Sequence, residues 1–197
     1  MRETFETNVF GVMAMVQAFV PLLLPARGLI INVASLAAVT SYAFGSVYAA
    51  TKGAVVAYSR CLRHELRPLG VRVMVAMTGT VRSHIAGKTH RELPPDSLYQ
   101  PVRDVFERRL VWSQNNATVP TDVYARQLVA AALRSEAPIW ARAWFGRPDW
   151  HWAGGLARLV WWGSFLGEWI VDVVCWRKFP LGKLEELVRQ TAQKKLP

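Results

Sequence analysis

Apolar side chains in the first 25 residues recur every three or four positions, which is the period of an amphipathic helix. The stripe consists of Phe5, Val9, Val12, Met13, Val16, Val20 and Leu23. A basic residue ahead of an apolar run also resembles a signal peptide, but Glu3 precedes this run, and Gln17 and Pro21 interrupt it. We therefore expect a helix packed on a sheet, and we interpret the run as short for a membrane span.

Two short runs of mostly apolar residues follow, and their length is that of buried strands. They cover residues 28–35 and 71–77, and between them residues 46–67 have helical periodicity. The sequence Pro68-Leu69-Gly70 marks the end of that helix. A strand, a helix and a strand in this order imply a parallel sheet with a right-handed crossover, so we predict an α/β fold.

The pattern changes after the second predicted strand. Residues 84–100 contain several prolines and few apolar pairs, and we interpret them as a long loop of the kind that forms a substrate lid. Residues 101–113 and 120–134 each open with a proline and are predicted as helices. Residues 138–145 are predicted as a third strand, which Gly146 ends.

The side chains of most chemical interest surround the first predicted strand and the helix after it. Ser35 ends the strand, and a serine at the carboxyl end of a parallel strand faces the crevice in which open α/β sheets bind ligands. Tyr48 and Lys52 are four residues apart on the next helix, so they share a face at about 5–6 Å. The sequence therefore brings a hydroxyl, a phenol and an ammonium group to one crevice.

These residue types suit proton transfer to and from a carbonyl oxygen. A free tyrosine has a pKa near about 10, and a lysine cation beside it favours the phenolate and lowers that pKa. Tyr48 can then protonate an alkoxide or deprotonate an alcohol near neutral pH. The Ser35 hydroxyl can hydrogen-bond the same oxygen and hold it in place. The three side chains predict a site that interconverts carbonyls and alcohols.

A serine at the end of a strand, with Tyr-x-x-x-Lys thirteen residues later on an Ala-rich helix, resembles the short-chain dehydrogenase/reductase family. In that family Asn, Ser, Tyr and Lys form the catalytic group, and Asn8 in Thr-Asn-Val-Phe-Gly matches the family asparagine. The resemblance implies that Tyr48 is the acid/base, Lys52 its electrostatic partner and Ser35 the donor to the substrate oxygen. It also implies that Asn8 orders a water reaching Lys52.

A second motif follows the second predicted strand. The family usually has Pro-Gly here, with a threonine four residues after the glycine, and uses this loop to contact the nicotinamide and the adjoining phosphate. Gly79 and Ser83 match that pattern, whereas Thr78 replaces the proline. The implied cofactor is NADP, with NAD as the alternative. The implied cofactor-binding residues are Tyr48, Lys52, Gly79, Val81 and Ser83.

The charge and the cysteine content of the chain indicate which kinds of partner and compartment suit it. Its 197 residues suit one domain, and its net charge of +10 favours anionic partners such as phosphorylated cofactors, lipid phosphates or membrane surfaces. No run of five like charges marks a nucleic-acid-binding arm. Cys61 and Cys175 do not make a disulfide framework, which fits a reducing, cytoplasmic compartment. His84, His90 and His151 have no Cys or His at metal-ligand spacing, so we predict no metal site.

The last part of the chain is rich in tryptophan, with eight of the nine between Trp140 and Trp176. We divide the chain into a catalytic region, residues 1–147, and an apolar and basic helical extension, residues 148–197. If the extension formed a single helix, its charged residues Arg158, Glu168 and Asp172 would fall near one face. Tryptophans followed by basic residues suit a helix lying on the cytosolic face of the endoplasmic reticulum or of a lipid droplet. Packing on the domain or in a homo-oligomer interface is the open alternative.

The extension carries a second, weaker resemblance. Its tryptophans, followed by the sequence Phe-Pro-Leu-Gly-Lys-Leu at residues 179–184, resemble fungal proteins similar to acyl-dihydroxyacetone-phosphate reductase. This implies a hydrophobic small-molecule substrate, either an acyl lipid or a secondary metabolite.

One part of the family pattern does not occur in the chain. A dinucleotide-binding fold opens with a Gly-rich phosphate loop, and neither Gly-x-x-x-Gly-x-Gly nor Gly-x-Gly-x-x-Gly is found. The resemblance thus covers the second half of a Rossmann-like parallel sheet with flanking helices. Met1 is either an internal methionine of a longer enzyme or the start of a remnant. We predict an NAD(P)-dependent oxidoreductase for ketones and secondary alcohols, with a cofactor-deficient interaction or structural protein as the alternative.

Overall fold

The computed structural model describes residues 1–83, 91–116, 119–138 and 140–193. In chain order its elements are the helices α1 (Arg2–Phe5), η1 (Glu6–Phe10) and α2 (Gly11–Ala26), the strand β1 (Leu29–Val33), the helices η2 (Leu36–Ala38), α3 (Ser46–Leu66) and η3 (Arg67–Leu69), the strand β2 (Arg72–Thr78), the helices η5 (Gln100–Val102), α4 (Arg103–Asn115), α5 (Thr121–Ala132) and α6 (Arg142–Phe145), the strand β3 (Trp150–Ala153), and the helices α7 (Ala157–Ser164), α8 (Glu168–Lys178) and α9 (Gly182–Gln193).

The three strands form one parallel sheet in the order β1-β2-β3. Leu29 pairs with Arg72 at the amino end of β1, and Val33 pairs with Ala76 at its carboxyl end. β2 in turn pairs with β3 from Val75 opposite Trp150 to Thr78 opposite Ala153. Because all strands are parallel, the residues that follow β1, β2 and β3 meet at one edge of the sheet. This confirms the predicted α/β class.

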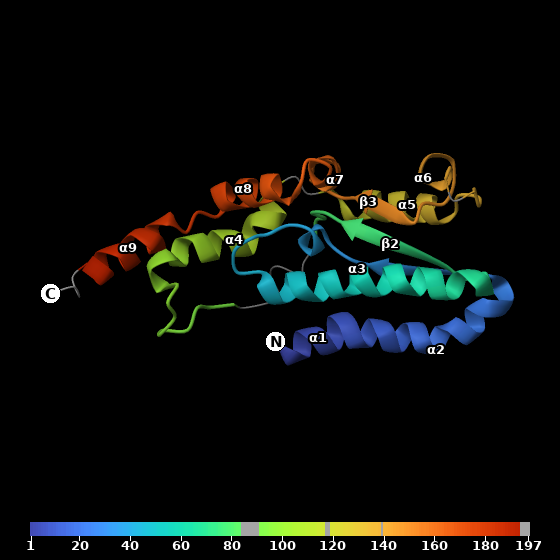
Figure 1. Ribbon diagram of the computed structural model, residues 1–197, viewed down its shortest axis with the longest axis horizontal. Coiled ribbons are helices and arrows are strands. Elements are labelled where there is room, and N and C mark those ends of the chain that lie inside the picture. Colours follow the sequence, from blue (N-terminus) through green and yellow to red (C-terminus); the bar gives the residue numbers. More distant parts are fainter. Residues whose placement is uncertain (84–90, 117–118, 139, 194–197) are drawn as a thin grey trace.

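The helices α2 and α3 lie side by side and cover the sheet, as Figure 1 shows. The core between these layers contains Val16, Ile30, Leu62, Leu66, Val71 and Val73. The whole predicted stripe of the first helix faces this interior, with Val9 and Val16 buried and its other members half-buried. The period of 3.6 residues therefore identified the packed face correctly.

The opposite face of the first helix is apolar and exposed, and includes Phe10, Met15, Phe19 and Leu22. Within the described part of the chain, Arg2–Ala26 is the one helix long and apolar enough to cross a membrane by length and composition. It has 25 residues, so the expectation that the run is short for a span is wrong on length alone.

The described residues of the range 138–145 do not form the predicted third strand. Residues 142–145 form the single helical turn α6, in which Trp144 and Phe145 are exposed. The third strand is Trp150–Ala153, where the amide of Val75 donates to the carbonyl oxygen of Asp149 and begins the pairing with β2. Both segments are rich in aromatic residues, and pairing with a distant strand decides between them.

The C-terminal extension is not one continuous helix. Gly167 has a φ of 101°, a left-handed conformation that separates α7 from α8. Arg158 therefore lies on α7, whereas Glu168 and Asp172 lie on α8. Beyond α8, Phe179 is buried against Val102 and Val105, so α8 and α9 lie along α4 (Figure 1).

The other predicted elements agree with the structure. Strands 28–35 and 71–77 correspond to β1 and β2, and the helices predicted between residues 46 and 134 correspond to α3, α4 and α5 within a few residues. Residues 91–99 form no helix or strand, as expected for a loop. The rest of the predicted lid, residues 84–90, lies outside the described residues together with His84 and His90.

Candidate active site

Tyr48 and Lys52 lie in the first two turns of α3, next to the carboxyl edge of the sheet. The Lys52 Nζ atom is 5.8 Å from the centroid of the Tyr48 ring, so the two side chains share a helix face, as their spacing predicts. The Tyr48 side chain is exposed, and no group of the described residues hydrogen-bonds its phenol oxygen. The phenol is therefore free to meet a substrate oxygen.

Lys52 is fixed by a hydrogen bond across the layers of the fold. Its ammonium group donates to the carbonyl oxygen of Val33, the last residue of β1, at 3.0 Å. Burial lowers the pKa of Lys52 from its ordinary range, because the charged form loses hydration. A cation held at this distance from a phenol favours the phenolate, which is the role that an acid/base tyrosine needs.

Ser35 follows β1 at the same edge of the sheet. Its backbone is extended, and its side-chain oxygen caps η2 by accepting a hydrogen bond from the amide of Ala37 at 3.2 Å. The amide of Ala34 continues the ladder by donating to Ala76, so the strand leads directly into this cap. Because the hydroxyl oxygen acts as an acceptor in the cap, its hydrogen remains available for a ligand oxygen.

Asn8 lies in the π-helical turn η1, a local irregularity that often accompanies functional sites. Its Nδ2 donates to the Thr51 hydroxyl at 3.1 Å, and that hydroxyl donates to the carbonyl oxygen of Tyr48 at 2.7 Å. Asn8 thus reaches the backbone of Tyr48 through Thr51. The water expected between Asn8 and Lys52 stays a prediction.

Sequence reasoning did not identify Thr51, which is fully buried. A threonine inside a helix commonly bonds back to a carbonyl oxygen of the preceding turn, so its position beside Lys52 carries no distinctive signal. Its function in the structure is to tie the N-terminal helix to the turn of α3 that carries Tyr48.

The loop after β2 is held by the backbone of the chain that follows β3. The Gly79 amide donates to Ala153 at 2.8 Å, and a Cβ atom at position 79 would lie only 2.1 Å from the carbonyl oxygen of Gly155. Glycine is required there because the two backbone segments approach so closely. Thr78, which stands in place of the family proline, uses its hydroxyl in a 2.6 Å hydrogen bond with Tyr124.

The two other predicted cofactor residues continue this loop along the same edge. Val81 forms an isolated parallel bridge with Val119, and the amide of Ser83 donates to the side chain of Gln114 at 3.1 Å. The structure thus brings Gly79, Val81 and Ser83 to the carboxyl end of β2, beside the end of β3 and α4. Their contacts with a cofactor remain a prediction.

An aromatic wall lies beside Tyr48 that the sequence did not reveal. The Tyr42 ring is half-buried, with the guanidinium of Arg109 at 4.2 Å from its centroid. Burial raises the pKa of Tyr42, and the neighbouring guanidinium of Arg109 opposes part of this rise. Phe44 packs edge-on against Phe106 with ring centroids 5.4 Å apart.

The C-terminal extension reaches the same wall. Phe179, Leu181 and Leu184 pack in the cluster that contains Tyr42 and Phe44, and Ser41 donates a hydrogen bond to Asp172 of α8. Segments more than 120 residues apart in the chain therefore meet around Tyr42 and Phe44, which precede Tyr48 in the chain by six and four residues. Among the described residues, no group of three His, Cys, Asp or Glu side chains is arranged to hold a metal ion.

Comparison with known sequences identifies related proteins. Residues 1–94 match the sequence model of the family described as short chain dehydrogenase. The chain is 36% identical over 98% of its length to the short-chain dehydrogenase fogD of Aspergillus ruber, and 34% identical over 98% to the NADPH-dependent 1-acyldihydroxyacetone phosphate reductase of Saccharomyces cerevisiae. It covers 64% and 62% of these proteins, so it spans a little under two thirds of their length.

Comparison with solved structures identifies the same fold. A short-chain dehydrogenase from Streptomyces avermitilis has a TM-score of 0.66 and 23% identity, covering 96% of this chain and 62% of the other. A short chain dehydrogenase from Burkholderia cenocepacia in complex with NADP has a TM-score of 0.59 and 24% identity, covering 88% of this chain and 58% of the other. The sheet and helices described above are therefore shared with these proteins.

Proposed function

The chain belongs to the short-chain dehydrogenase/reductase family, and we propose that it supplies the acid/base site of an oxidoreductase that interconverts a ketone and a secondary alcohol. The observation that carries this proposal is the pairing of Tyr48 with Lys52. The ammonium group is anchored to Val33 and the phenol oxygen is open to a ligand. Ordinary surface tyrosines do not have a fixed cation on the same helix face.

The residues have distinct tasks in the proposed reduction. The Ser35 hydroxyl donates to the carbonyl oxygen of the substrate and positions it. Tyr48 transfers its phenolic proton to that oxygen as the alcohol forms, and Lys52 stabilises the resulting phenolate. In the oxidation, the phenolate accepts the alcohol proton. The hydride exchanged with the substrate carbon is the chemistry that a bound nicotinamide supplies.

The donors at this edge of the sheet fit the nicotinamide half of a dinucleotide. The Lys52 ammonium and the Tyr48 hydroxyl are hydrogen-bond donors of the kind that hold ribose hydroxyls, and Gly79, Val81 and Ser83 follow β2 at the same edge of the sheet. NADP is the proposed cofactor, with NAD as the alternative. The name of the Saccharomyces cerevisiae relative, which specifies NADPH, supports this choice.

We propose a hydrophobic substrate, either an acyl lipid or a secondary metabolite. The aromatic wall of Tyr42 and Phe44, closed by Phe179 of the C-terminal extension, supports this proposal because it gives an apolar surface beside Tyr48. The name of the Saccharomyces cerevisiae relative, a 1-acyldihydroxyacetone phosphate reductase, supports the acyl class.

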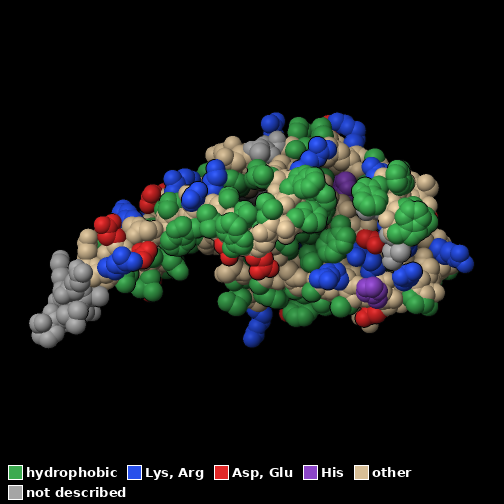
Figure 2. All heavy atoms as spheres, turned by 45° about the horizontal axis from the view of Figure 1, so that its top comes forward, with side chains coloured by type: hydrophobic (Ala, Val, Ile, Leu, Met, Phe, Trp, Pro, Cys, Tyr) green, Lys and Arg blue, Asp and Glu red, His purple; other side chains and the backbone are tan. Residues whose placement is uncertain are grey.

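We also propose that the extension rests on the cytosolic face of the endoplasmic reticulum or of a lipid droplet. Trp162, Phe165 and Trp169 are exposed on α7, α8 and the turn between them, and Figure 2 shows hydrophobic side chains gathered over the C-terminal helices. Large exposed aromatic surfaces mark sites of interaction. Burial of such a surface in a homo-oligomer is the alternative, and it would give a single, larger species in solution.

The decisive experiment compares Tyr48→Phe with Tyr58→Phe, which removes the hydroxyl of another tyrosine on the same helix. Ketone-dependent oxidation of NADPH by the chain should fall about 100-fold or more in Tyr48→Phe and stay near wild type in Tyr58→Phe. Wild-type turnover in Tyr48→Phe would contradict the assignment.

A calorimetric titration with NADPH separates the enzyme from the alternative interpretation. Micromolar binding would exclude a cofactor-deficient remnant. Absence of both binding and turnover would favour an interaction or structural protein over a catalyst, because such a chain makes too few phosphate contacts.

A further inference from the structure

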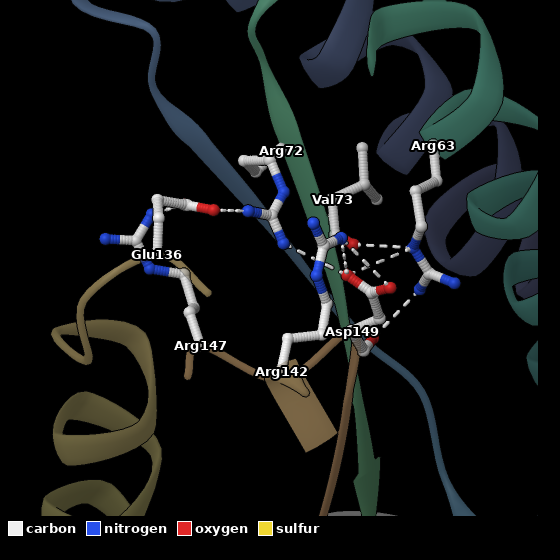
Figure 3. A network of polar contacts seen from close by, with 7 residues as sticks. All are labelled: Arg63, Arg72, Val73, Glu136, Arg142, Arg147 and Asp149. Atoms are coloured by element: carbon white, nitrogen blue, oxygen red, sulfur yellow. Dashed lines mark hydrogen bonds and ion pairs between the residues drawn. The ribbon is translucent and has the colours of Figure 1, made fainter. Parts of the chain in front are cut away.

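Figure 3 shows a cluster of arginines at the amino end of β2. Tyr48 and Lys52 lie at the opposite, carboxyl edge of the sheet. Arg72 is the first residue of β2, Arg63 comes from the last turns of α3, and Arg142 begins α6. They converge on Asp149, which immediately precedes β3. Three different elements, one of them about 70 residues further along the chain, therefore bring their guanidinium groups to one place.

The contacts of Asp149 organise this cluster. Its Oδ1 accepts from Arg142 at 3.1 Å and from Arg72 at 3.2 Å, and it lies 3.9 Å from Nε of Arg63. One carboxylate therefore serves three cations. A second carboxylate, that of Glu136, pairs with Arg147 at 3.0 Å and with Arg72.

Backbone carbonyl groups and a tryptophan ring hold Arg63 in place, in addition to the charge of Asp149. Arg63 donates through Nε to the carbonyl oxygen of Val73 at 2.9 Å and through Nη2 to the carbonyl oxygen of Asp149 at 2.8 Å. Its guanidinium also lies 5.2 Å from the centroid of the Trp150 ring. The side chains of Arg63, Arg72 and Arg142 are only 13–16% exposed. The donors of this site are thus positioned before any ligand arrives.

A cavity of about 140 Å³ opens between these side chains. Its lining consists of Arg63, His64, Arg67, Val71, Arg72, Arg142 and Asp149. Since one ordered water needs about 10–15 Å³ measured in this way, there is room for a tetrahedral group with four oxygens.

The site has more positive charge and more donors than its own residues use. Five guanidinium groups face two carboxylates, so three positive charges are left uncompensated. The cations are those of Arg63, Arg67, Arg72, Arg142 and Arg147, and the carboxylates are those of Asp149 and Glu136. Burial lowers the pKa of Arg63 and of Arg72, and the neighbouring charge of Arg142 lowers both further. The buried Nε atom of Arg142, a residue that lines the cavity, has no hydrogen-bond partner within the described structure. Buried donors are normally hydrogen-bonded, so a buried donor without a partner indicates a place for an acceptor.

We propose that this cavity binds a small oxyanion, either phosphate or a phosphate monoester. A dianion matches the excess of positive charge better than a carboxylate, and guanidinium groups present paired donors that match the oxygens of phosphate. The site is separate from the proposed acid/base site and does not depend on it, because it lies at the opposite ends of the strands.

The test is a calorimetric titration of the chain with inorganic phosphate, repeated on Arg142→Gln and Arg67→Gln. Each substitution removes one cavity-lining guanidinium and should weaken phosphate binding about tenfold or more. Arg67 is exposed, so its substitution leaves the fold intact even if Arg142→Gln does not. The matched control is Arg126→Gln, which removes the same charge from an exposed pair with Asp122 on α5 and should leave the affinity unchanged.

Free phosphate and a lipid headgroup share this chemistry, and exposed Trp140, Trp144 and Phe145 lie next to Arg142 in the chain. A second arm therefore uses vesicles of phosphatidylcholine with and without phosphatidic acid. Binding to phosphatidic acid vesicles alone, lost in Arg67→Gln, would identify the headgroup as the source of the phosphate. The proposal is overturned if neither phosphate nor these vesicles bind, or if Arg126→Gln weakens binding as much as Arg67→Gln.

Discussion

The ammonium group of Lys52 donates to the carbonyl oxygen of Val33 across 3.0 Å and thereby connects the second turn of α3 to the last residue of β1. The same side chain lies 5.8 Å from the Tyr48 ring. The end of β1 therefore holds the cation on the helix face that carries the phenol. This arrangement brings the groups of the proposed acid/base site together from a strand end and the helix α3.

This relationship predicts that Lys52 lowers the stability of the chain at neutral pH. The pKa of Lys52 is lowered by burial in the folded state, so the unfolded chain binds its proton more tightly. Lys52→Met should therefore raise the urea midpoint at pH 7. As pH rises through the folded pKa towards the ordinary value of 10.5, the wild type sheds this proton and gains stability, so the difference should shrink.

The measurement is urea unfolding between neutral pH and the ordinary lysine pKa, together with NADPH oxidation. Lys178→Met removes an exposed ammonium and should leave the midpoint at pH 7 almost unchanged. Lys52→Met should also lose turnover, because residues that serve activity often lower the stability of the fold. A destabilised Lys52→Met at pH 7 would show that the hydrogen bond to Val33 outweighs the cost of burial.

A pair of glycine substitutions tests the close approach of the loop after β2 to the chain after β3. In Gly79→Ala the new methyl group would meet the carbonyl oxygen of Gly155, so unfolding free energy should fall by about 2–3 kcal/mol. In Gly53→Ala, inside α3, the methyl group meets nothing within 4 Å and should stabilise the helix by about 0.5–1 kcal/mol. Equal effects in urea unfolding would contradict this geometry.

Asp149 is expected to be the most sensitive carboxylate of the fold. Asp149→Asn leaves Arg63, Arg72 and Arg142 facing one another without their shared counter-charge, and should cost about 2–3 kcal/mol, since the site is only partly screened by water. The control Asp122→Asn breaks an exposed pair with Arg126 and should cost less than about 0.5 kcal/mol. Urea unfolding at neutral pH compares the two, and similar losses would mean that the arginine cluster does not need its carboxylate.

Local regularities were predictable from the sequence because they depend on residues a few positions apart. The apolar stripe of the first helix follows from a period of 3.6, and the shared face of Tyr48 and Lys52 follows from a spacing of four. Ser35 was placed correctly after β1 because a short apolar run ends there.

Contacts between distant segments were not predictable in this way. Asn8 meets Thr51 across 43 positions, and nothing in either local pattern indicates that pairing. We predicted the third strand at residues 138–145 because strand propensity is similar there and in the aromatic segment that follows. In the structure β2 pairs instead with the segment that begins at Asp149, whose carbonyl oxygen accepts a hydrogen bond from the amide of Val75. The break at Gly167 was missed because the stretch is mostly apolar on both sides of it.

The proposed membrane contact leads to a prediction that separates two exposed apolar faces. One contains Trp162, Phe165 and Trp169, and the other contains Phe19 and Leu22 of α2. Serine substitution of the three C-terminal aromatics should abolish flotation with phosphatidylcholine and phosphatidylserine vesicles, because tryptophan and phenylalanine bury much apolar area at an interface. Binding of the wild type should survive moderate salt, which screens attraction by basic residues but not burial of aromatic ones.

The matched control is the substitution of Phe19 and Leu22 by serine, which changes apolar area in the first helix and leaves the extension intact. Flotation of this control at the wild-type level, with loss in the C-terminal variant, is the expected result. The reverse outcome would assign the membrane contact to Arg2–Ala26, the helix whose length and composition suffice for a span. If wild type and both variants stay in the soluble fraction, the aromatic surface of α7 and α8 serves the substrate site or a second copy of the chain, and size-exclusion chromatography distinguishes these by the mass of the species.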